Sequence, residues 1–449
     1  MKKYGNGQIT KAVKACIIES ELGSLEIRTH EIVENKVRRQ IYSLADEYFE
    51  RKDPNKKIVS ARMAELINSW ASSTVSYREL VDQLNRFRLE EDGGIKLTWL
   101  RDYIEKTGEE INAALHEQAA FVLEANGFEK DGNKKAETTI ETKEEVDKKA
   151  EAAWKKEIKA AATRIEMDEP VKTSDYECPY NVVNISADDV LTNRQASSRP
   201  NAPEKGQRKY VTNTVIHIEH QERNTDSNNL IQKEYVLCDD NIKGAFGILM
   251  GFLAANDLIG MPQYVFYTDG ASDLRGPIET LFAPFNYKII LDWHHLMEKT
   301  EQRLSSGMKS YKLRHVFEDE ILKPLLWRGK VSEAISQLKN IPVEDIKSKD
   351  AIDKLIDYLT RNEKYIPCYA LRRELGLRNS SNRVEKANDC IVSKRQKNNG
   401  MSWSFEGSRS LASVTAVRKN DELKSWCMKD TLRFSFSPVP VNDAVNRAA

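Results

Sequence analysis

The chain has 449 residues, of which 40% are hydrophobic and 31% charged, and 69 Lys and Arg residues balance 69 Asp and Glu residues. This length suits roughly two to four domains, and no segment approaches the roughly 20 apolar residues of a membrane span or the pattern of a signal peptide. Six cysteines without CxxC spacing argue against a zinc ribbon and a disulfide framework, so we expect a cytoplasmic protein.

The N-terminal part of the chain is predicted to be helical. Apolar residues recur three and four apart in segments such as 29–50 and 61–70. We therefore predict a helical region over residues 1–128. A stretch rich in Lys, Glu, Ala and Thr follows, and it indicates a charged helical linker over residues 129–175.

Two short segments of the N-terminal region resemble the parts of a helix-turn-helix. Residues 76–79 (SYRE) have the pattern of a helix cap. Residues 98–101 (TWLR) could begin a recognition helix, whose first residues face base edges. An ordinary helical bundle explains the same pattern equally well. On the DNA-binding interpretation, the candidate contacts are Tyr77, Arg78, Trp99 and Arg101.

The composition changes after Pro179, where β-branched residues become frequent. Three runs with largely alternating polarity predict a meander of strands, and two nearly wholly apolar runs predict buried strands between helices. The predicted order is β-β-β-α-β-α-β-α, which is the order of a ribonuclease-H-like fold. The strands are expected at residues 181–187, 211–219, 231–237, 263–268 and 287–291, and the helices at 242–256, 273–282 and from His294.

The fold class that follows is α+β with several domains: an N-terminal helical DNA-binding region, then a ribonuclease-H-like mixed-sheet core with an all-helical insertion. Lys, Glu and Leu recur at helical spacing after the last strand, which predicts the insertion. The expected divisions are the first part of the core at 176–304, the insertion at 305–370, the last part of the core at 371–437 and a disordered tail at 438–449.

Three carboxylates stand where such a fold would bring them together. Asp188, with Asp189 beside it, lies at the end of the first strand, and Asp269 follows the fourth strand, where open α/β sheets bind ligands. Glu385 lies on a helix expected over residues 382–396. Carboxylate oxygens are the ligands that Mg²⁺ prefers, and a pair of such ions can cleave and join phosphodiester bonds. Alternation along a strand points only one of the two adjacent aspartates toward Asp269, and the pattern leaves open which one.

A second candidate group follows the fifth strand. Asp292 and His295 are three residues apart, so both side chains could face the same site and contact phosphate or a base. Asp292 could equally well serve only as the cap of the next helix. No other Cys or His lies nearby at zinc-ligand spacing.

A basic stretch surrounds Glu385. Residues 372–397 carry eight Arg and Lys residues against three acidic ones, a net charge of +5 in a chain that is neutral overall. Local charge of this kind favours contact with the DNA backbone. The candidate phosphate contacts are Arg383, Lys394, Arg395 and Lys397. Trp403, which follows in a short aromatic turn, could belong to a core or wedge against DNA.

Several motifs taken together resemble the bacterial insertion-sequence transposases of the ISLre type, which are loosely related to the Mutator-like group. The resemblance covers roughly residues 70–420, and its last two motifs are the most specific. The motifs are SYREL at 76–80, SADDV at 186–190, YTDGASDLR at 267–275, LDWHHL at 291–296 and NGMSWSFEGSRSL at 399–411.

The resemblance implies a DDE transposase with its triad at Asp188, Asp269 and Glu385, and with Asp189, Asp292 and His295 in supporting positions. It implies two Mg²⁺ ions, which Mn²⁺ can replace, double-stranded DNA as substrate and a homo-oligomer assembled on DNA at the bacterial nucleoid. Relatives often have Gly after the first Asp, where this chain has Asp189. Three alternatives remain: a nuclease of the same fold that does not join strands, a non-catalytic DNA-binding protein derived from a transposase, and a generic helical scaffold with an α/β domain.

Overall fold

A computed structural model shows an α+β protein made of two compact units. The described residues are 3–4, 7–21, 23–34, 41–43, 58–86, 88, 94–143, 148–195, 209–223, 230–397 and 401–438. The first unit comprises Met1–Asn112, Arg194–Ala202 and Lys394–Arg433, and the second comprises Ala113–Asn193, Pro203–Ser393 and Phe434–Ala449. Within the described ranges, no helix has the length and apolar character needed to cross a membrane.

The first unit begins with a β-sheet rather than the expected helices. Its strands are β1 (Lys3–Tyr4), β2 (Gly7–Ser20), β3 (Gly23–Glu34), β4 (Ile41–Ser43) and β5 (Ile58–Val59). The prediction of a helix over residues 29–50 is therefore wrong where this range is described, at 29–34 and 41–43. The pattern of β3 explains the error, because Leu25, Ile27 and Thr29 alternate with charged residues at the period of a strand.

Helices follow the sheet in the described part of the first unit. They are α2 (Ala61–Ala71), α3 (Tyr77–Arg86), the first part of α4 (Leu97–Ala125), α15 (Lys394–Gln396), α16 (Phe405–Lys419) and α17 (Leu423–Lys429). The cap predicted for α3 is present, because the Ser76 N–H donates to Glu79 (2.9 Å) and the Glu79 N–H donates to Ser76 Oγ (3.2 Å). Leu411 packs in one core with Ile67, Leu80 and Leu100. Residues 394–433 thus fold with the N-terminal helices, whereas 371–437 had been expected in the core of the other domain.

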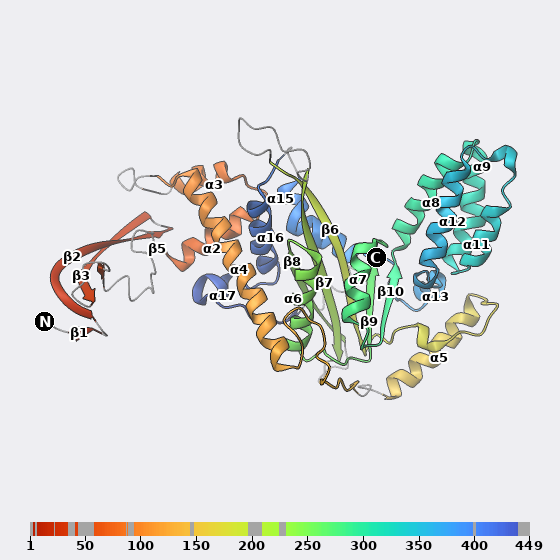
Figure 1. Ribbon diagram of the computed structural model, residues 1–449, viewed down its shortest axis with the longest axis horizontal. Helices are drawn as coiled ribbons and strands as arrows, with labels where there is room; N and C mark the ends of the chain where they lie inside the picture. The colour runs from red at the N-terminus through yellow and green to blue at the C-terminus, as the bar shows by residue number, and fades with distance from the viewer. Residues whose placement is uncertain are drawn as a thin grey trace. The chain divides into compact units, whose positions relative to one another are not determined.

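The second unit is built on a six-stranded sheet with the order β10-β9-β6-β7-β8-β11 (Figure 1). Strands β6, β7 and β8 form an antiparallel meander, and β9 and β10 lie parallel to β6. The five predicted strands and their order along the chain are confirmed. The bounds are β6 (Val182–Asn193), β7 (Tyr210–Arg223), β8 (Leu230–Asp239), β9 (Gln263–Thr268), β10 (Tyr287–Leu291) and β11 (Ser437–Pro438).

Helices cover both faces of this sheet. Tyr235 of β8 stacks on Phe252 of α6 (Ile242–Ala255), and Phe266 of β9 packs on Phe282 at the end of α7 (Ser272–Leu281), so these two helices share one face. Side chains alternate between faces along each strand. Glu219, opposite Glu234 in the ladder, therefore faces the other side, where it meets α14 (Asn382–Asn388) and the segment leading to it.

Along the chain, a set of helices follows β10 and precedes α14, where the insertion was expected. Several of these helices are labelled in Figure 1. Its elements are α8 (Trp293–Gly307), α9 (Tyr311–Val316), the π-helix η3 (Phe317–Leu322), α10 (Lys323–Trp327), α11 (Val331–Lys339), η4 (Val343–Asp345), α12 (Lys349–Asn362), η5 (Glu363–Tyr365) and α13 (Tyr369–Glu374). The helix predicted over 382–396 is continuous, but its middle is a π-helix, η6 (Asp389–Ser393), between α14 and α15.

The expected linker and tail are described only in part. Residues 148–164 of the predicted linker form α5 (Lys148–Arg164), and η2 (Thr173–Asp175) follows it. Ile158 and Ala161 of α5 pack against Leu371 of α13, so this segment is part of the second unit's structure. Of the predicted tail, Pro438 pairs with Lys233 in the sheet, and residues 439–449 lie outside the described residues.

Candidate active site

Asp188 and Asp269 lie on adjacent strands. The parallel ladder between β6 and β9 ends at Ser186 opposite Tyr267, and the same register carried two residues further places Asp188 opposite Asp269. Asp188 was predicted at the end of its strand. This prediction is wrong, because β6 continues to Asn193. The neighbouring strand β9 ends at Thr268 instead, so β6 has no parallel partner at Asp188 and one edge of the ladder opens there.

The side chains of Asp188 and Asp189 point to opposite faces of the sheet. Asp188 Oδ2 accepts a hydrogen bond from Asn388 of α14 (2.6 Å), so its carboxylate faces that helix. Asp189 Oδ1 accepts from Thr214 Oγ1 on β7 (2.6 Å), and the nearby carboxylate of Asp273 on α7 adds to the rise that burial causes in its pKa. Asp188 is therefore the aspartate on the sheet face that α14 covers.

The turn after β9 holds Asp269 in place. Asp269 Oδ1 accepts from the Ala271 N–H (2.8 Å), and Gly270 adopts a φ of +87°, which favours glycine. Arg275 of α7 donates to the Gly270 carbonyl (2.6 Å) and to Asn362 at the end of α12 (2.7 Å). The turn carrying Asp269 is thus tied both to α7 and to the helical insertion.

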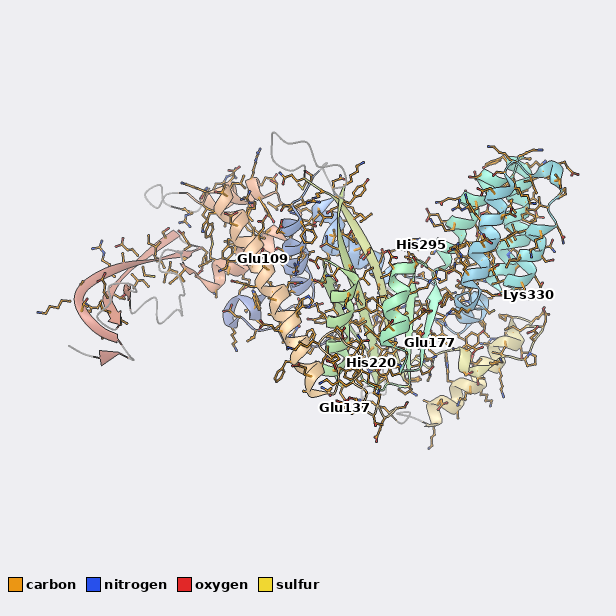
Figure 2. The ribbon with its side chains drawn as sticks, in the orientation of Figure 1. Glu109, Glu137, Glu177, His220, His295 and Lys330 are labelled. Atoms are coloured by element: carbon orange, nitrogen blue, oxygen red, sulfur yellow. The ribbon has the colours of Figure 1, made fainter. Side chains whose placement is uncertain are left out.

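Glu385 is half-exposed on α14 and lies close to His295. His295 is on the first turn of α8, as labelled in Figure 2. His295 Nε2 is 3.4 Å from Glu385 Oε1. His295 is also close enough to Asp188 for its charge to oppose the rise in the pKa of that carboxyl. The structure therefore brings Asp188, Asp269, Glu385 and His295 to one edge of the sheet.

Asp292 was predicted to face the same site as His295, but its side chain is turned into the interior. Its side chain is fully buried, and Oδ1 accepts from the His295 N–H (2.9 Å), which caps α8. Oδ2 accepts from the N–H (2.5 Å) and the hydroxyl (3.1 Å) of Ser381, the residue that precedes α14. The Asp292 carboxylate joins the start of α8 to the start of α14 and is engaged in protein hydrogen bonds.

We expect Asp292→Ala to lower the free energy of unfolding by about 2–4 kcal/mol, because it leaves buried N–H groups of His295 and Ser381 without acceptors. Urea denaturation followed by circular dichroism measures this change. Ser310→Ala is the matched control, since Ser310 caps the exposed helix α9 and its loss should cost about 1 kcal/mol. Equal losses in the two variants would show that Asp292 is only a cap.

The electrostatics of the site favour a bound cation. Burial and the nearby Asp269 carboxylate raise the pKa of Asp188 to about 6. The charged form of Asp188 is therefore less favourable than that of an ordinary aspartate, and a nearby positive charge would stabilise it. The donor atoms of Asp188, Asp269 and Glu385 are all carboxylate oxygens, which suit the hard ions Mg²⁺ and Mn²⁺.

The raised pKa of Asp188 predicts how the stability of the metal-free protein depends on pH. The folded protein holds this proton up to about pH 6, whereas the unfolded chain releases it near about pH 4. The contribution of Asp188 therefore falls as pH rises between these values, by up to about 3 kcal/mol, and stays low at higher pH.

We expect Asp188→Asn to remove this pH dependence. In EDTA at pH 7.5 the variant should be more stable than the wild type, and the difference should vanish near pH 4. Urea denaturation at both pH values measures it, with Asp353→Asn, an exposed position on α12, as the control. A wild type that is the more stable of the two at pH 7.5 would contradict the raised pKa.

Most of the arginines in the basic stretch are used inside the protein. Arg372 is fully buried and pairs with Glu177, and Arg378 pairs with Glu219. Arg383, predicted to contact phosphate, is also directed at Glu219, with Nε 3.6 Å from Oε1 and only 19% of its side chain exposed. Two buried glutamates therefore offset part of the net charge of +5, and the predicted phosphate contact of Arg383 is not supported.

The three other predicted phosphate contacts belong to the first unit. Arg395 is buried, donates to the Ala71 carbonyl (3.1 Å) and lies over the rings of Tyr77 (5.0 Å) and Trp403 (5.1 Å). The predicted phosphate contact of Arg395 is not supported, because its guanidinium lies over two rings that meet edge to face and donates to a backbone carbonyl in the interior. Trp403 is part of the core. Lys394 and Lys397 are exposed.

Of the four DNA contacts predicted in the N-terminal helices, three lie together and Trp99 lies apart from them. Tyr77, Arg78 and Arg101 line one hollow of the first unit, about 650 Å³ in volume. Three carboxylates share it, and Arg101 pairs with Asp102 (2.7 Å). The carboxylates are those of Glu105, Glu109 and Glu406. Trp99 lines another hollow and stacks on Tyr103, with ring centroids 5.5 Å apart.

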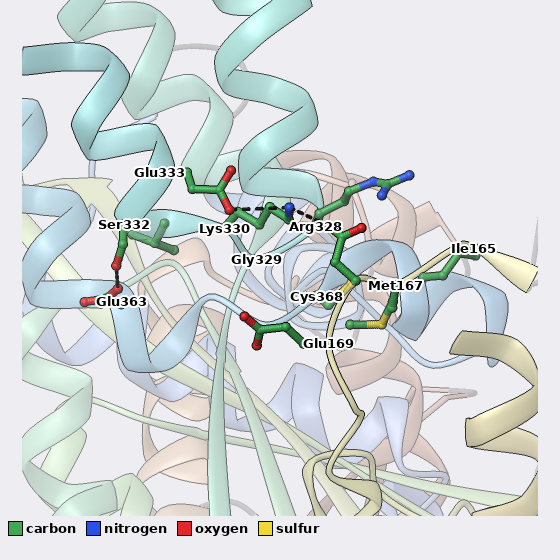
Figure 3. A pocket seen from close by; sticks show the side chains of 12 residues that line it. Ile165, Met167, Glu169, Arg328, Gly329, Lys330, Ser332, Glu333, Glu363 and Cys368 are labelled. Atoms are coloured by element: carbon green, nitrogen blue, oxygen red, sulfur yellow. Dashed lines mark hydrogen bonds and ion pairs between the residues drawn. The ribbon is translucent and has the colours of Figure 1, made fainter. Parts of the chain in front are cut away.

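A hollow of the second unit, about 270 Å³ in volume, contains none of the predicted site residues (Figure 3). Lys330 Nζ is 2.7 Å from Asp168 and 3.4 Å from Glu333, and Ser332 donates to Glu363 (2.7 Å). Five of the polar side chains of this hollow are thus engaged with one another.

Some residues at the carboxylate edge were not found by sequence reasoning. Asn388 reaches Asp188 from one turn beyond Glu385, and only the α14–β6 packing reveals it. The buried hydroxyl of Tyr358 on α12 lies near Gly270 and finds no hydrogen-bond partner in the described part of the chain. Elsewhere on the sheet, His217, Glu219 and Glu234 come within metal-binding distance of one another, but Arg378 and Arg383 already neutralise Glu219.

The chain matches no protein-family profile, and a search of curated proteins finds none similar to it. Its function is therefore argued from the residues and their arrangement.

Proposed function

We propose that this protein is a DDE transposase that cleaves and joins DNA strands for an insertion sequence. The observation that carries the proposal is the meeting of Asp188, Asp269 and the helix bearing Glu385 at one open edge of the sheet. Each carboxylate comes from a rigid element, as a site that must hold cations in fixed positions requires.

We further propose that the sheet of the second unit is a ribonuclease-H-like core. Its support is the strand order β10-β9-β6-β7-β8, with three antiparallel strands followed by two parallel ones. The first strand, the fourth strand and a late helix supply the three carboxylates, which is the distribution that the sequence motifs imply. Helices α9 to α12 are the proposed insertion before the final Glu.

The carboxylates of Asp188, Asp269 and Glu385 would hold two Mg²⁺ ions, or Mn²⁺ in their place. When bound, such ions supply Lewis-acid chemistry for an in-line displacement at phosphorus. The protein's own residues fix the geometry. Hydrogen bonds orient Asp188, the turn at Gly270 orients Asp269, and His295, once Glu385 turns to a cation, can donate to a phosphate oxygen.

For DNA contact in the first unit we propose the exposed cations Arg78, Lys394 and Lys397. Joining requires that two element ends be held together, so a homo-oligomer on DNA is part of the proposal. Such an enzyme would act on the bacterial chromosome in the nucleoid.

Incubation of the purified protein with DNA carrying the two ends of its own element tests the proposal. We expect 3′-end cleavage and joined products in Mg²⁺ or Mn²⁺, and neither in EDTA. DNA with scrambled ends is the control. Cleavage without joined products would support the nuclease alternative, and specific binding without cleavage would support the non-catalytic one.

A further inference from the structure

Asn388 is a buried polar residue beside the proposed metal ligands. It lies on α14 three residues after Glu385, which places the two on neighbouring positions of the helix surface. Its side-chain N–H donates to Asp188 Oδ2 (2.6 Å), and only 7% of the residue is exposed. The opposite atom of the amide, Oδ1, is buried and has no hydrogen-bond partner among the described residues.

Asn388 completes a pair of donors that hold the Asp188 carboxylate. Oδ1 of Asp188 accepts from the N–H of Asp189 (2.8 Å), and Oδ2 accepts from Asn388. With one donor on each oxygen, the plane of the carboxylate is fixed. Each oxygen of an ionised carboxylate has two lone pairs, so one on each remains for a cation.

The buried Oδ1 of Asn388 argues that this amide has more than a packing role. A buried carbonyl oxygen without a partner destabilises the fold, whereas an apolar side chain of the same shape would not. The helix also changes to a π-helix directly after Asn388, at Asp389. Single π-turns inside α-helices are frequent at functional sites.

We propose that Asn388 is a positioning residue of the metal site: it orients Asp188 for the cation and links that carboxylate to the helix carrying Glu385. This inference rests on the proposed function. Loss of a hydrogen-bonding partner behind a metal ligand typically weakens metal binding about 10–100-fold. We expect an effect of that size at Asn388, in the absence of DNA and of any reaction.

The test is a Mn²⁺ titration of the DNA-free protein by electron paramagnetic resonance, with Asn388→Leu and Asn388→Ala compared with wild type. We expect the Kd for Mn²⁺ to rise about 10–100-fold in both variants. Asn382→Ala, at an exposed position of the same helix, should leave the Kd unchanged. Melting in EDTA separates folding from metal binding, and Asn388→Leu should melt no lower than wild type.

A double substitution isolates the contact between the two side chains. In an Asp188→Asn background, adding Asn388→Leu should not weaken Mn²⁺ binding further, because the oriented carboxylate is already gone. Should Asn388→Leu not fold, Asn388→Gln, which keeps the amide but displaces it, should show the same weakened binding.

The outcomes separate this inference from the proposed function. If wild type binds Mn²⁺ and folded Asn388 variants bind it equally well, the inference is overturned while the metal site stands. If wild type itself binds no Mn²⁺, the proposed function is overturned and the inference with it. A loss of melting temperature in EDTA with an unchanged Kd would likewise overturn the positioning role.

Discussion

Replacing Asp269 by Asn is expected to lower the rate of Mg²⁺-dependent strand cleavage and joining by at least about 10³-fold, which corresponds to about 4 kcal/mol of transition-state stabilisation. The substitution keeps the size of the side chain but removes a charged oxygen that faces Asp188. Because the Asp269 oxygen also accepts from the Ala271 N–H, which the Asn side-chain oxygen can still do, the turn should remain intact. Glu385→Gln is expected to have a loss of the same order.

Single-turnover cleavage of pre-bound element DNA measures this effect, with DNA affinity determined in parallel. Asp273→Asn is the matched control, because it makes the same chemical change at an exposed position four residues further on. It should retain at least about half of the wild-type rate. Unchanged rates in both Asp269→Asn and Glu385→Gln would show that this carboxylate group is not the catalytic one and would direct attention to Asp189.

The largest loss of stability is expected from Arg372→Met. Arg372 and Glu177 are almost completely buried, and two guanidinium nitrogens contact the two carboxylate oxygens at 2.7 and 2.5 Å. Removing the guanidinium leaves a buried carboxylate without its counter-charge. Such a loss costs about 3–5 kcal/mol, a large fraction of the roughly 5–15 kcal/mol by which ordinary proteins are stable.

Urea denaturation of the variant and of the pair Arg372→Met with Glu177→Leu measures this effect. The double variant should recover most of the loss, because a buried ion pair and an apolar pair of similar volume are often close in stability. Lys354→Met, which breaks the exposed pair between Lys354 and Asp350, should cost less than about 0.5 kcal/mol. A double variant no more stable than Arg372→Met would show that Arg372 acts through packing.

The strands of the second unit could be predicted because their patterns are unambiguous. Residues 263–268 and 287–291 are short, apolar and bounded by turn residues, and the strands β9 and β10 have these limits. The N-terminal sheet was missed because apolar residues recur at helical spacing from the end of β3 onward, at Val33, Val37 and Ile41. That spacing was given more weight than the alternation within β3.

Candidate carboxylates could be found from their positions at strand ends, but their partners could not. Asn388 meets Asp188 only through the packing of α14 on β6, across 200 positions of the chain. The basic stretch was misread for a related reason. The sequence shows how many arginines occur between residues 372 and 397. It does not show that three of them are directed at Glu177 and Glu219, which are distant in sequence.

The hydrogen bonds from Ser381 to Asp292 bring together two residues that are 89 positions apart and bracket the helical insertion. Loop-closure entropy grows only slowly with length, so a stem closed in this way tolerates wide changes in what it encloses. We therefore expect changes of length within the insertion to leave the spacing of α8 and α14 intact. The end of α12, where Asn362 meets Arg275, is a second point at which the insertion is tied to the turn that carries Asp269.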